Sequence, residues 1–97
     1  MVSPIIVGII PAVIAPLDKK RVDIRFQNTG VSIIYLKKIP LTGVFSFPSA
    51  TDYEVLLAPA ALLNEAGEAF VTNSVSSFAA VSSIPGGILA IYETRKV

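Results

Sequence analysis

The chain has 97 residues, of which 53% are apolar and only 15% carry a charge. Its 8 basic and 7 acidic residues leave a net charge of +1, without the electrostatic footprint of a nucleic-acid-binding protein. The absence of cysteine excludes disulfides and thiolate metal sites, and the absence of histidine removes the commonest general base and metal ligand.

The apolar content exceeds what one small domain can bury. A chain of this length forms a single domain, and it buries roughly 60–65% of the surface that its unfolded form exposes. Its mean hydropathy is +0.69, and its 15% of charged residues compares with about 25% in an ordinary domain. We therefore expect part of the apolar surface to face another protein chain.

Residues 1–17 contain no charge and are interrupted by Pro4, Pro11 and Pro16. A membrane-spanning helix needs about 20 apolar residues and seldom contains proline in its interior. A signal peptide needs a basic start and a small-x-small cleavage site, which this segment lacks. We favour a third interpretation, an extended arm or edge strand, with a strand from Ile5 to Ile10, that docks on neighbouring subunits.

The stretch 21–38 predicts two strands folded back on each other as a hairpin. Apolar and polar side chains alternate through its first strand, and this period of two is typical of a sheet with one buried face. The apolar set is Val22, Ile24 and Phe26, and the polar set is Arg21, Asp23, Arg25 and Gln27.

The hairpin turn is expected at residues 28–30, because Asn tolerates a left-handed backbone and Gly adopts one without penalty. The second strand, 31–38, is rich in the β-branched and aromatic residues that strands favour. Residues 18–20, which precede the hairpin, are interpreted as a solvated polar turn.

The rest of the chain predicts further short strands, over 44–48, 53–57, 68–72, 75–83 and 88–95, the last two joined by a hairpin turn at Gly86 and Gly87. Residues 59–66 favour one short helical turn capped by Gly67, and a loop with a strand over 61–63 fits almost as well. Short strands at this spacing indicate a small antiparallel β-sandwich or barrel of about 6–8 strands. The expected organisation is an arm over 1–17 and a single all-β domain over 18–97.

No group of residues carries a strong chemical signature. Asp52 and Glu54 would share a strand face, as two glycosidase carboxylates could, but we interpret them as a charged strand edge. Asn64, Glu65 and Glu68 offer oxygen atoms to calcium, but three scattered ligands do not make a recognisable loop. We expect no catalytic residue, no metal site and no cofactor.

Several segments, taken together, follow one pattern. RVDIRFQN at 21–28 precedes an Ile-Tyr-Leu strand at 34–36, and later come 67–70, 79–82 and the ILAIYE stretch at 88–93. Over residues 21–95 this pattern resembles small virion proteins of bacteriophages, although the apolar segment 1–17 departs from it. The resemblance implies a β-sandwich capsid decoration, or cement, protein that clamps neighbouring major-capsid subunits, often as a trimer.

We therefore expect a non-enzymatic structural subunit located in the virion. Its partners would be the major capsid protein or other virion subunits and further copies of the chain, with a trimer favoured, and neither nucleic acid nor membrane is expected. The residues expected to make these contacts are Ile5, Ile6, Val7, Ile9, Ile10, Val13, Ile14, Phe45 and Phe47. Two alternatives stay open: a carbohydrate- or receptor-binding module at a vertex or fibre, with Phe47 or Tyr53 in a groove, and a small membrane-associated virion protein held by residues 1–17.

Overall fold

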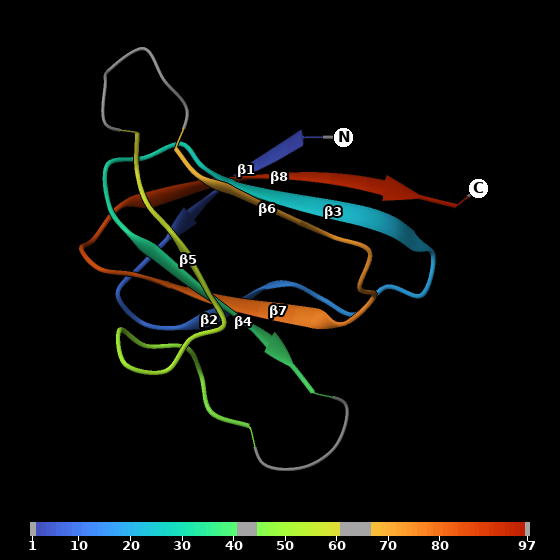
Figure 1. Cartoon of the computed structure of the whole chain (residues 1–97), viewed down its shortest axis with the longest axis horizontal. Helices are drawn as coiled ribbons and strands as arrows, with labels where there is room; N and C mark the ends of the chain where they lie inside the picture. Colours follow the sequence, from blue (N-terminus) through green and yellow to red (C-terminus); the bar gives the residue numbers. More distant parts are fainter. Residues whose placement is uncertain (1, 41–44, 61–66, 97) are drawn as a thin grey trace.

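The computed structural model describes residues 2–40, 45–60 and 67–96, and these form strands and loops without a helix. The strands are β1 (Val2–Val7), β2 (Ala12–Ala15), β3 (Arg21–Asn28), β4 (Ile34–Ile39), β5 (Val55–Leu57), β6 (Ala69–Thr72), β7 (Ser77–Ser82) and β8 (Gly87–Arg95). Sheet A has the order β1-β8-β3-β6 and sheet B the order β2-β7-β4-β5, and all pairs are antiparallel (Figure 1). The predicted all-β sandwich is confirmed.

The strand pairing has a simple rule. β1 pairs with β8, β2 with β7, β3 with β6 and β4 with β5. The chain is therefore one long antiparallel ribbon of strand pairs, and successive pairs lie alternately in sheet A and sheet B. Two further pairings, β3 with β8 and β4 with β7, join the ribbon into sheets. This is the strand order of a jelly roll.

The loops that connect the strands gather at two opposite ends of the sandwich (Figure 1). Loops 8–11, 29–33 and 83–86 pass from one sheet to the other at the left-hand end of the view. Loops 16–20 and 73–76 do so at the right-hand end, toward which the two chain termini also lie. Residues that are far apart in the sequence are thus brought together at each end.

The core lies between the sheets and is built from the inward-facing residues of both. Phe26 of sheet A and Phe78 of sheet B meet there, with ring centroids 5.0 Å apart. The other large buried apolar side chains include Ile24, Ile34, Leu36, Leu57 and Leu89. Alternation along β3 buries Ile24, Phe26 and Asn28, one residue in two, as the period of two requires.

The predicted hairpin over 21–38 is wrong, because β3 belongs to sheet A and β4 to sheet B. Both neighbours of β3, β6 and β8, come from the end of the chain. The expected turn at 28–30 relied on Asn28 or Gly30 in a left-handed conformation, and among the described residues only Gly86 has a positive φ. The 28–30 turn instead sends the chain across the core to the other sheet.

The predicted faces of the first strand need a second correction at its start. The pairing of β3 with β8 shifts register between Arg21 and Asp23, so Val22 occupies a β-bulge. Val22 is therefore 43% exposed, whereas Arg21, which was assigned to the charged face, is buried. From Asp23 to Asn28 the expected alternation holds.

The second predicted hairpin, at Gly86 and Gly87, is also wrong, because β7 lies in sheet B and β8 in sheet A. Gly86 does form the turn, with a φ of 81° that other residues seldom adopt. Gly87 is already the first residue of β8, and a Cβ atom there would lie 2.6 Å from Oγ of Ser82. Its lack of a side chain lets the crossing strand pass close to sheet B.

Residues 2–17 do not extend away from the domain. They form β1 and β2, the edge strands of sheets A and B, and Val7 and Ala15 are part of the buried core. This placement corrects the expected boundary between residues 17 and 18, because main-chain pairing with β8 and β7 ties the segment to its own domain. The extended conformation itself agrees with the prediction.

The segment between β4 and β5 differs from the two strands expected there. Residues 45–48 form no strand, and β5 begins only at Val55. The loop instead covers part of the outer face of sheet B: Pro48 is fully buried, and the ring of Tyr53 lies 5.0 Å from that of Tyr35 on β4. The helix or strand expected around 61–66 falls outside the described residues.

Candidate functional site

The two carboxylates that could have suggested catalysis each hold a structural partner. Asp52 accepts hydrogen bonds from Lys37 Nζ at 2.8 Å and from Ser46 Oγ at 2.7 Å, and the Lys37 bond is the main cause of its lowered pKa. Glu54 accepts a hydrogen bond from the main-chain N–H of Lys38 at 2.7 Å. Both side chains therefore fasten the β4–β5 loop to β4.

The residues considered for calcium do not form a site in the part of the chain that the structure describes. Asn64 and Glu65 lie outside it, and Glu68 accepts a hydrogen bond from the main-chain N–H of Ala58 at 3.1 Å. Within residues 2–40, 45–60 and 67–96, no three His, Cys, Asp or Glu side chains are grouped so that they could hold a metal ion.

The gap between the two sheets, at the side formed by β4, β5, β6 and β7, holds only about 60 Å³. Its walls combine the apolar side chains of Leu36, Val55, Phe70 and Phe78 with polar and charged residues from the rims of the two sheets: Lys37, Lys38, Glu54, Thr72 and Ser74. Pockets that bind small molecules usually measure about 300–1,000 Å³. This gap is therefore too small for a ligand of that kind.

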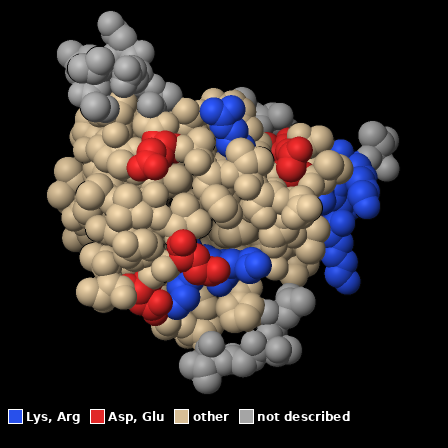
Figure 2. Space-filling view, in the orientation of Figure 1, with Lys and Arg blue, Asp and Glu red and all other residues tan. Residues whose placement is uncertain are grey.

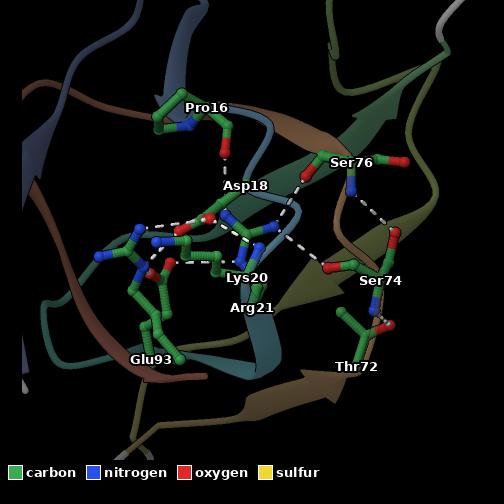
Figure 3. Close-up of polar contacts among 9 residues, drawn as sticks. Pro16, Asp18, Lys20, Arg21, Thr72, Ser74, Ser76 and Glu93 are labelled. Carbon is green, nitrogen blue, oxygen red and sulfur yellow. Dashed lines mark hydrogen bonds and ion pairs between the residues drawn. The ribbon is translucent and has the colours of Figure 1, made fainter. Parts of the chain in front are cut away.

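A buried arginine organises the right-hand end of the sandwich (Figure 3). The Arg21 guanidinium pairs with Glu93 Oε2 at 3.2 Å and donates to the main-chain carbonyls of Pro16, Ser74 and Ser76 at 2.9, 3.1 and 2.9 Å. Its side chain is fully buried, so these bonds replace the water that it loses. We call this group the Arg21 clasp; it ties loops 16–20 and 73–76 to β8.

A more exposed ion pair lies beside the clasp. Arg95 Nε donates to Asp18 Oδ2 at 2.6 Å, and the main-chain N–H of Lys20 donates to Asp18 Oδ1 at 3.0 Å. The hydrogen bond from Arg95, followed by that from Lys20, lowers the pKa of Asp18. Lys19 and Lys20 are exposed nearby, and Lys96 donates its main-chain N–H to the carbonyl of Lys20 at 2.7 Å. This end is therefore charged, and Figure 2 shows basic side chains gathered there.

The opposite end has the reverse character. Loops 8–11, 29–33 and 83–86 contain no charged residue, and each exposes aliphatic side chains. The large exposed aliphatic residues of these loops and the adjoining strands are Ile6, Ile9, Ile10, Val31, Ile84 and Ile88, with exposed fractions from 40% to 82%. We call these six residues the apolar end.

Main-chain contacts hold the three loops together. The main-chain N–H of Ser82 donates to the carbonyl of Gly8 at 2.9 Å, and that of Ser83 donates to the carbonyl of Ile33 at 2.9 Å. The N–H of Thr29 donates to the carbonyl of Ile88 at 3.0 Å. Ile6 and Ile88 lie directly opposite each other on β1 and β8, with both side chains pointing away from the core. The apolar end therefore gathers exposed aliphatic side chains from segments along the whole length of the chain.

The residues expected to make contacts fall into three groups. Ile6, Ile9, Ile10, Val13 and Phe47 are exposed, while Ile5, Ile14 and Phe45 are half-buried. Val7 is 3% exposed and belongs to the core, so its assignment to an interface is corrected. On β1 the period of two turns Val7 inward and Ile6 outward.

Sequence reasoning missed Val31, Ile84 and Ile88, since the first two were assigned to a strand and a turn. A signal was present, because both lie in Gly- or Pro-containing turns, where an exposed polar residue is usual. Their position beside Ile9 and Ile10 follows only from the crossing of the loops between the sheets.

A smaller aromatic surface lies on the β4–β5 loop. The rings of Phe45 and Phe47 are 5.1 Å apart, and Phe47 and Tyr53 are 49% and 42% exposed. The same loop borders an open hollow on sheet B, lined by Ile9, Pro11, Tyr35, Pro48, Ser49, Ala50, Val81, Ser82 and Ser83.

Among the described residues, no helix has the length and apolar character needed to cross a membrane. Comparison with protein-family models, curated proteins and solved structures finds no match for this chain.

Proposed function

We propose that this protein is a non-enzymatic structural subunit of a viral particle, a capsid decoration or cement protein that attaches to shell subunits through its apolar end. The observation that carries the proposal is the group of exposed aliphatic side chains on the uncharged loops 8–11, 29–33 and 83–86. Large exposed apolar surfaces mark sites where another molecule binds.

The chemistry of the apolar end favours a protein partner. Fully burying one Ile or Val side chain is worth about 1.5–3 kcal/mol, so a few such residues can hold a weakly associating subunit. Anionic lipid would require basic residues beside the aliphatic ones, and loops 8–11, 29–33 and 83–86 contain none, while Lys19, Lys20 and Lys96 lie with loop 16–20 at the opposite end.

The strand order supports the proposal by analogy. Jelly rolls are common in viral capsid proteins, lectins and cupins, and a fold of this kind serves several functions. A lectin uses polar groups and exposed aromatic rings around its site, and the loops 8–11, 29–33 and 83–86 contain no aromatic and no charged residue. The capsid class therefore fits this surface better than the sugar-binding class.

The test is co-sedimentation of the purified chain with shells of the virus that encodes it. The variant Val31→Asp places a charge in the apolar end, and Val71→Asp makes the same change on β6, where Val71 is 60% exposed. We expect Val31→Asp to weaken binding at least about tenfold, the equivalent of 1.4 kcal/mol, with Val71→Asp close to wild type. Equal binding by both variants and the wild type would show that the apolar end takes no part in binding the shell.

A second candidate function is glycan or receptor binding by the aromatic surface. Phe47 and Tyr53 are partly exposed beside the hollow on sheet B. A glycan array would then give hits that disappear with Phe47→Ala, and an array without hits would exclude the binding of its sugars.

A further inference from the structure

The free edge of β1 differs from the other sheet edges among the described residues. β1 has 6 residues, whereas the remaining edge strands β2, β5 and β6 have 4, 3 and 4. β2 is also interrupted by a register shift between Val13 and Ala15. β1 carries no charge and no bulge, and within its six residues Pro4 alone blunts the edge, so the rest of the edge is free to pair with another strand.

The direction of each main-chain group on β1 follows from a contact on the far side of β8. Thr29 donates its N–H to the carbonyl of Ile88, so the main chain of Ile88 is turned toward β3. Main-chain groups alternate in direction along a strand, so those of 87, 89 and 91 are turned toward β1. Their partners are Val7, Ile5 and Ser3, which make the hydrogen bonds to β8.

Pro4 and Ile6, which lie between these residues, therefore turn their main-chain groups to the free edge. Pro4 has no N–H, which agrees with this direction, since a proline is tolerated on an edge strand where no donor is needed. Pro4 can only accept a hydrogen bond, whereas Ile6 can both donate and accept. No hydrogen bond from the described residues occupies the outer side of Ile6.

We propose that the free edge of β1 binds the same edge of a second copy of this chain, antiparallel about a two-fold axis at Ile6. Ile6 of each copy then donates its N–H to the Ile6 carbonyl of the other. An axis at Pro4 would oppose two carbonyls without a donor. An axis at Ile5 would set Ile6 against Pro4, leaving the Ile6 carbonyl unpaired.

Charge agrees with a second copy as the occupant. At a two-fold axis the residue on the axis faces its own counterpart, and its neighbours face residues of the same segment, so a segment carrying one sign of charge would meet like charges. Residues 2–17 and 84–92, which include β1 and most of β8, contain no charge. Ile6 is 80% exposed, and the pairing would bring it against the second copy and join the two A sheets into one.

The first experiment measures the native mass of the chain and of two variants at position 6. Wild type is expected at twice 10.3 kDa. Ile6→Pro removes the outward N–H without touching the bonds to β8, and Ile6→Ala keeps that N–H while removing most of the side chain. Because Ile6→Pro removes two hydrogen bonds across the axis, we expect it to raise the dissociation constant of the dimer at least about tenfold more than Ile6→Ala does.

The second experiment uses the absence of cysteine in the natural sequence. Paired residues of this kind lie about 5.5 Å apart between Cα atoms, within the range that a disulfide spans. Mild oxidation should therefore cross-link Ile6→Cys into a covalent dimer and leave Val71→Cys, on the edge strand β6, monomeric. This test decides the matter if Ile6→Pro fails to fold by circular dichroism.

A monomeric or trimeric wild type, or equal cross-linking at positions 6 and 71, would overturn the proposal. The measurements use the isolated chain, so they are independent of whether it binds a viral shell.

Discussion

The side-chain amide of Asn28, at the end of β3 in sheet A, donates a hydrogen bond to the carbonyl of Leu57 in sheet B at 2.8 Å. The same nitrogen donates to the carbonyl of Ser32 at 2.6 Å, and Oδ1 accepts from the N–H of Gly30 at 3.0 Å. Asn28 is fully buried, so one side chain fixes the crossing loop and joins the two sheets.

Replacing Asn28 by Asp should destabilise the protein strongly at pH 7, because a carboxylate cannot donate to the two carbonyls. A buried polar group without a partner costs about 1–3 kcal/mol, so the total is expected to exceed about 3 kcal/mol. Urea denaturation measures this cost, with the exposed Asn73→Asp as the control expected within about 0.5 kcal/mol of wild type. Similar stability of the two variants would show that the amide donors are dispensable.

Arg21→Ala should be among the most damaging single substitutions in this chain. It leaves the partly buried Glu93 and three main-chain carbonyls without their common donor, and breaking such a pair costs about 3–5 kcal/mol. The control is Arg25→Ala on the same strand, where the side chain is exposed and the expected cost is below about 1 kcal/mol. Equal midpoints in urea would mean that the Arg21 clasp adds no stability.

The Asp18–Arg95 pair should give the stability of the protein a dependence on acid pH. The hydrogen bonds from Arg95 and Lys20 hold the pKa of Asp18 in the folded state below its ordinary value of 3.8, so folding favours the ionised form. The contribution is therefore present above pH 3.8 and is lost as the pH falls through the lower folded pKa. Wild type should exceed Asp18→Asn in stability at pH 7, and the difference should shrink below about pH 3.8; a constant difference would contradict this account.

Gly67→Ala should destabilise the fold through a direct clash. A Cβ atom at this position would lie 2.5 Å from the carbonyl oxygen of Asn28 and 2.7 Å from that of Ala58, and both atoms belong to the main chain. Forcing extra volume into such a site typically costs about 1–3 kcal/mol. Gly8→Ala is the matched control, since its nearest atom would be 3.9 Å away and little change is expected. Thermal unfolding of both variants measures the difference.

The strands themselves could largely be predicted from the sequence. The period of two in 21–28 gives the bounds of β3, and the apolar run after Gly87 gives β8 to within a residue. The pairing could not be predicted, because alternation shows which face of a strand is buried and says nothing about its neighbours. Asn-Thr-Gly and Gly-Gly were therefore assigned to hairpins, although both stretches carry the chain between sheets.

The burial of residues on the outer face of sheet B could not be predicted from the sequence either. Tyr35, Ala79 and Val81 point away from the core and are nevertheless buried, at 9%, 0% and 7% exposed. β4 and β7 begin with near-continuous apolar runs, which is the pattern of strands covered on both sides. The β4–β5 loop, whose Tyr53 ring lies 5.0 Å from that of Tyr35, has no such pattern and could not be identified in advance as a cover for β4.

Only part of the apolar end could be identified from the sequence, because its residues come from segments that the fold brings together. Ile6, Ile9 and Ile10, which are expected from the sequence to make contacts, are exposed, whereas Val31 and Ile84 come from turns far along the chain. Only the winding of the ribbon brings these turns together. A surface made by three separated loops has no signature in any one of them.

The pairing of β1 with β8 also sets the order of events during synthesis. Val7 of β1 pairs with Gly87 of β8, so β1 has no partner strand until residues 87–95 have left the ribosome. Sheet topologies with such distant partners fold in milliseconds to seconds, slowly for a protein of this size. Newly made chains should therefore aggregate more readily than the finished protein, and co-expressed chaperones should raise the soluble yield.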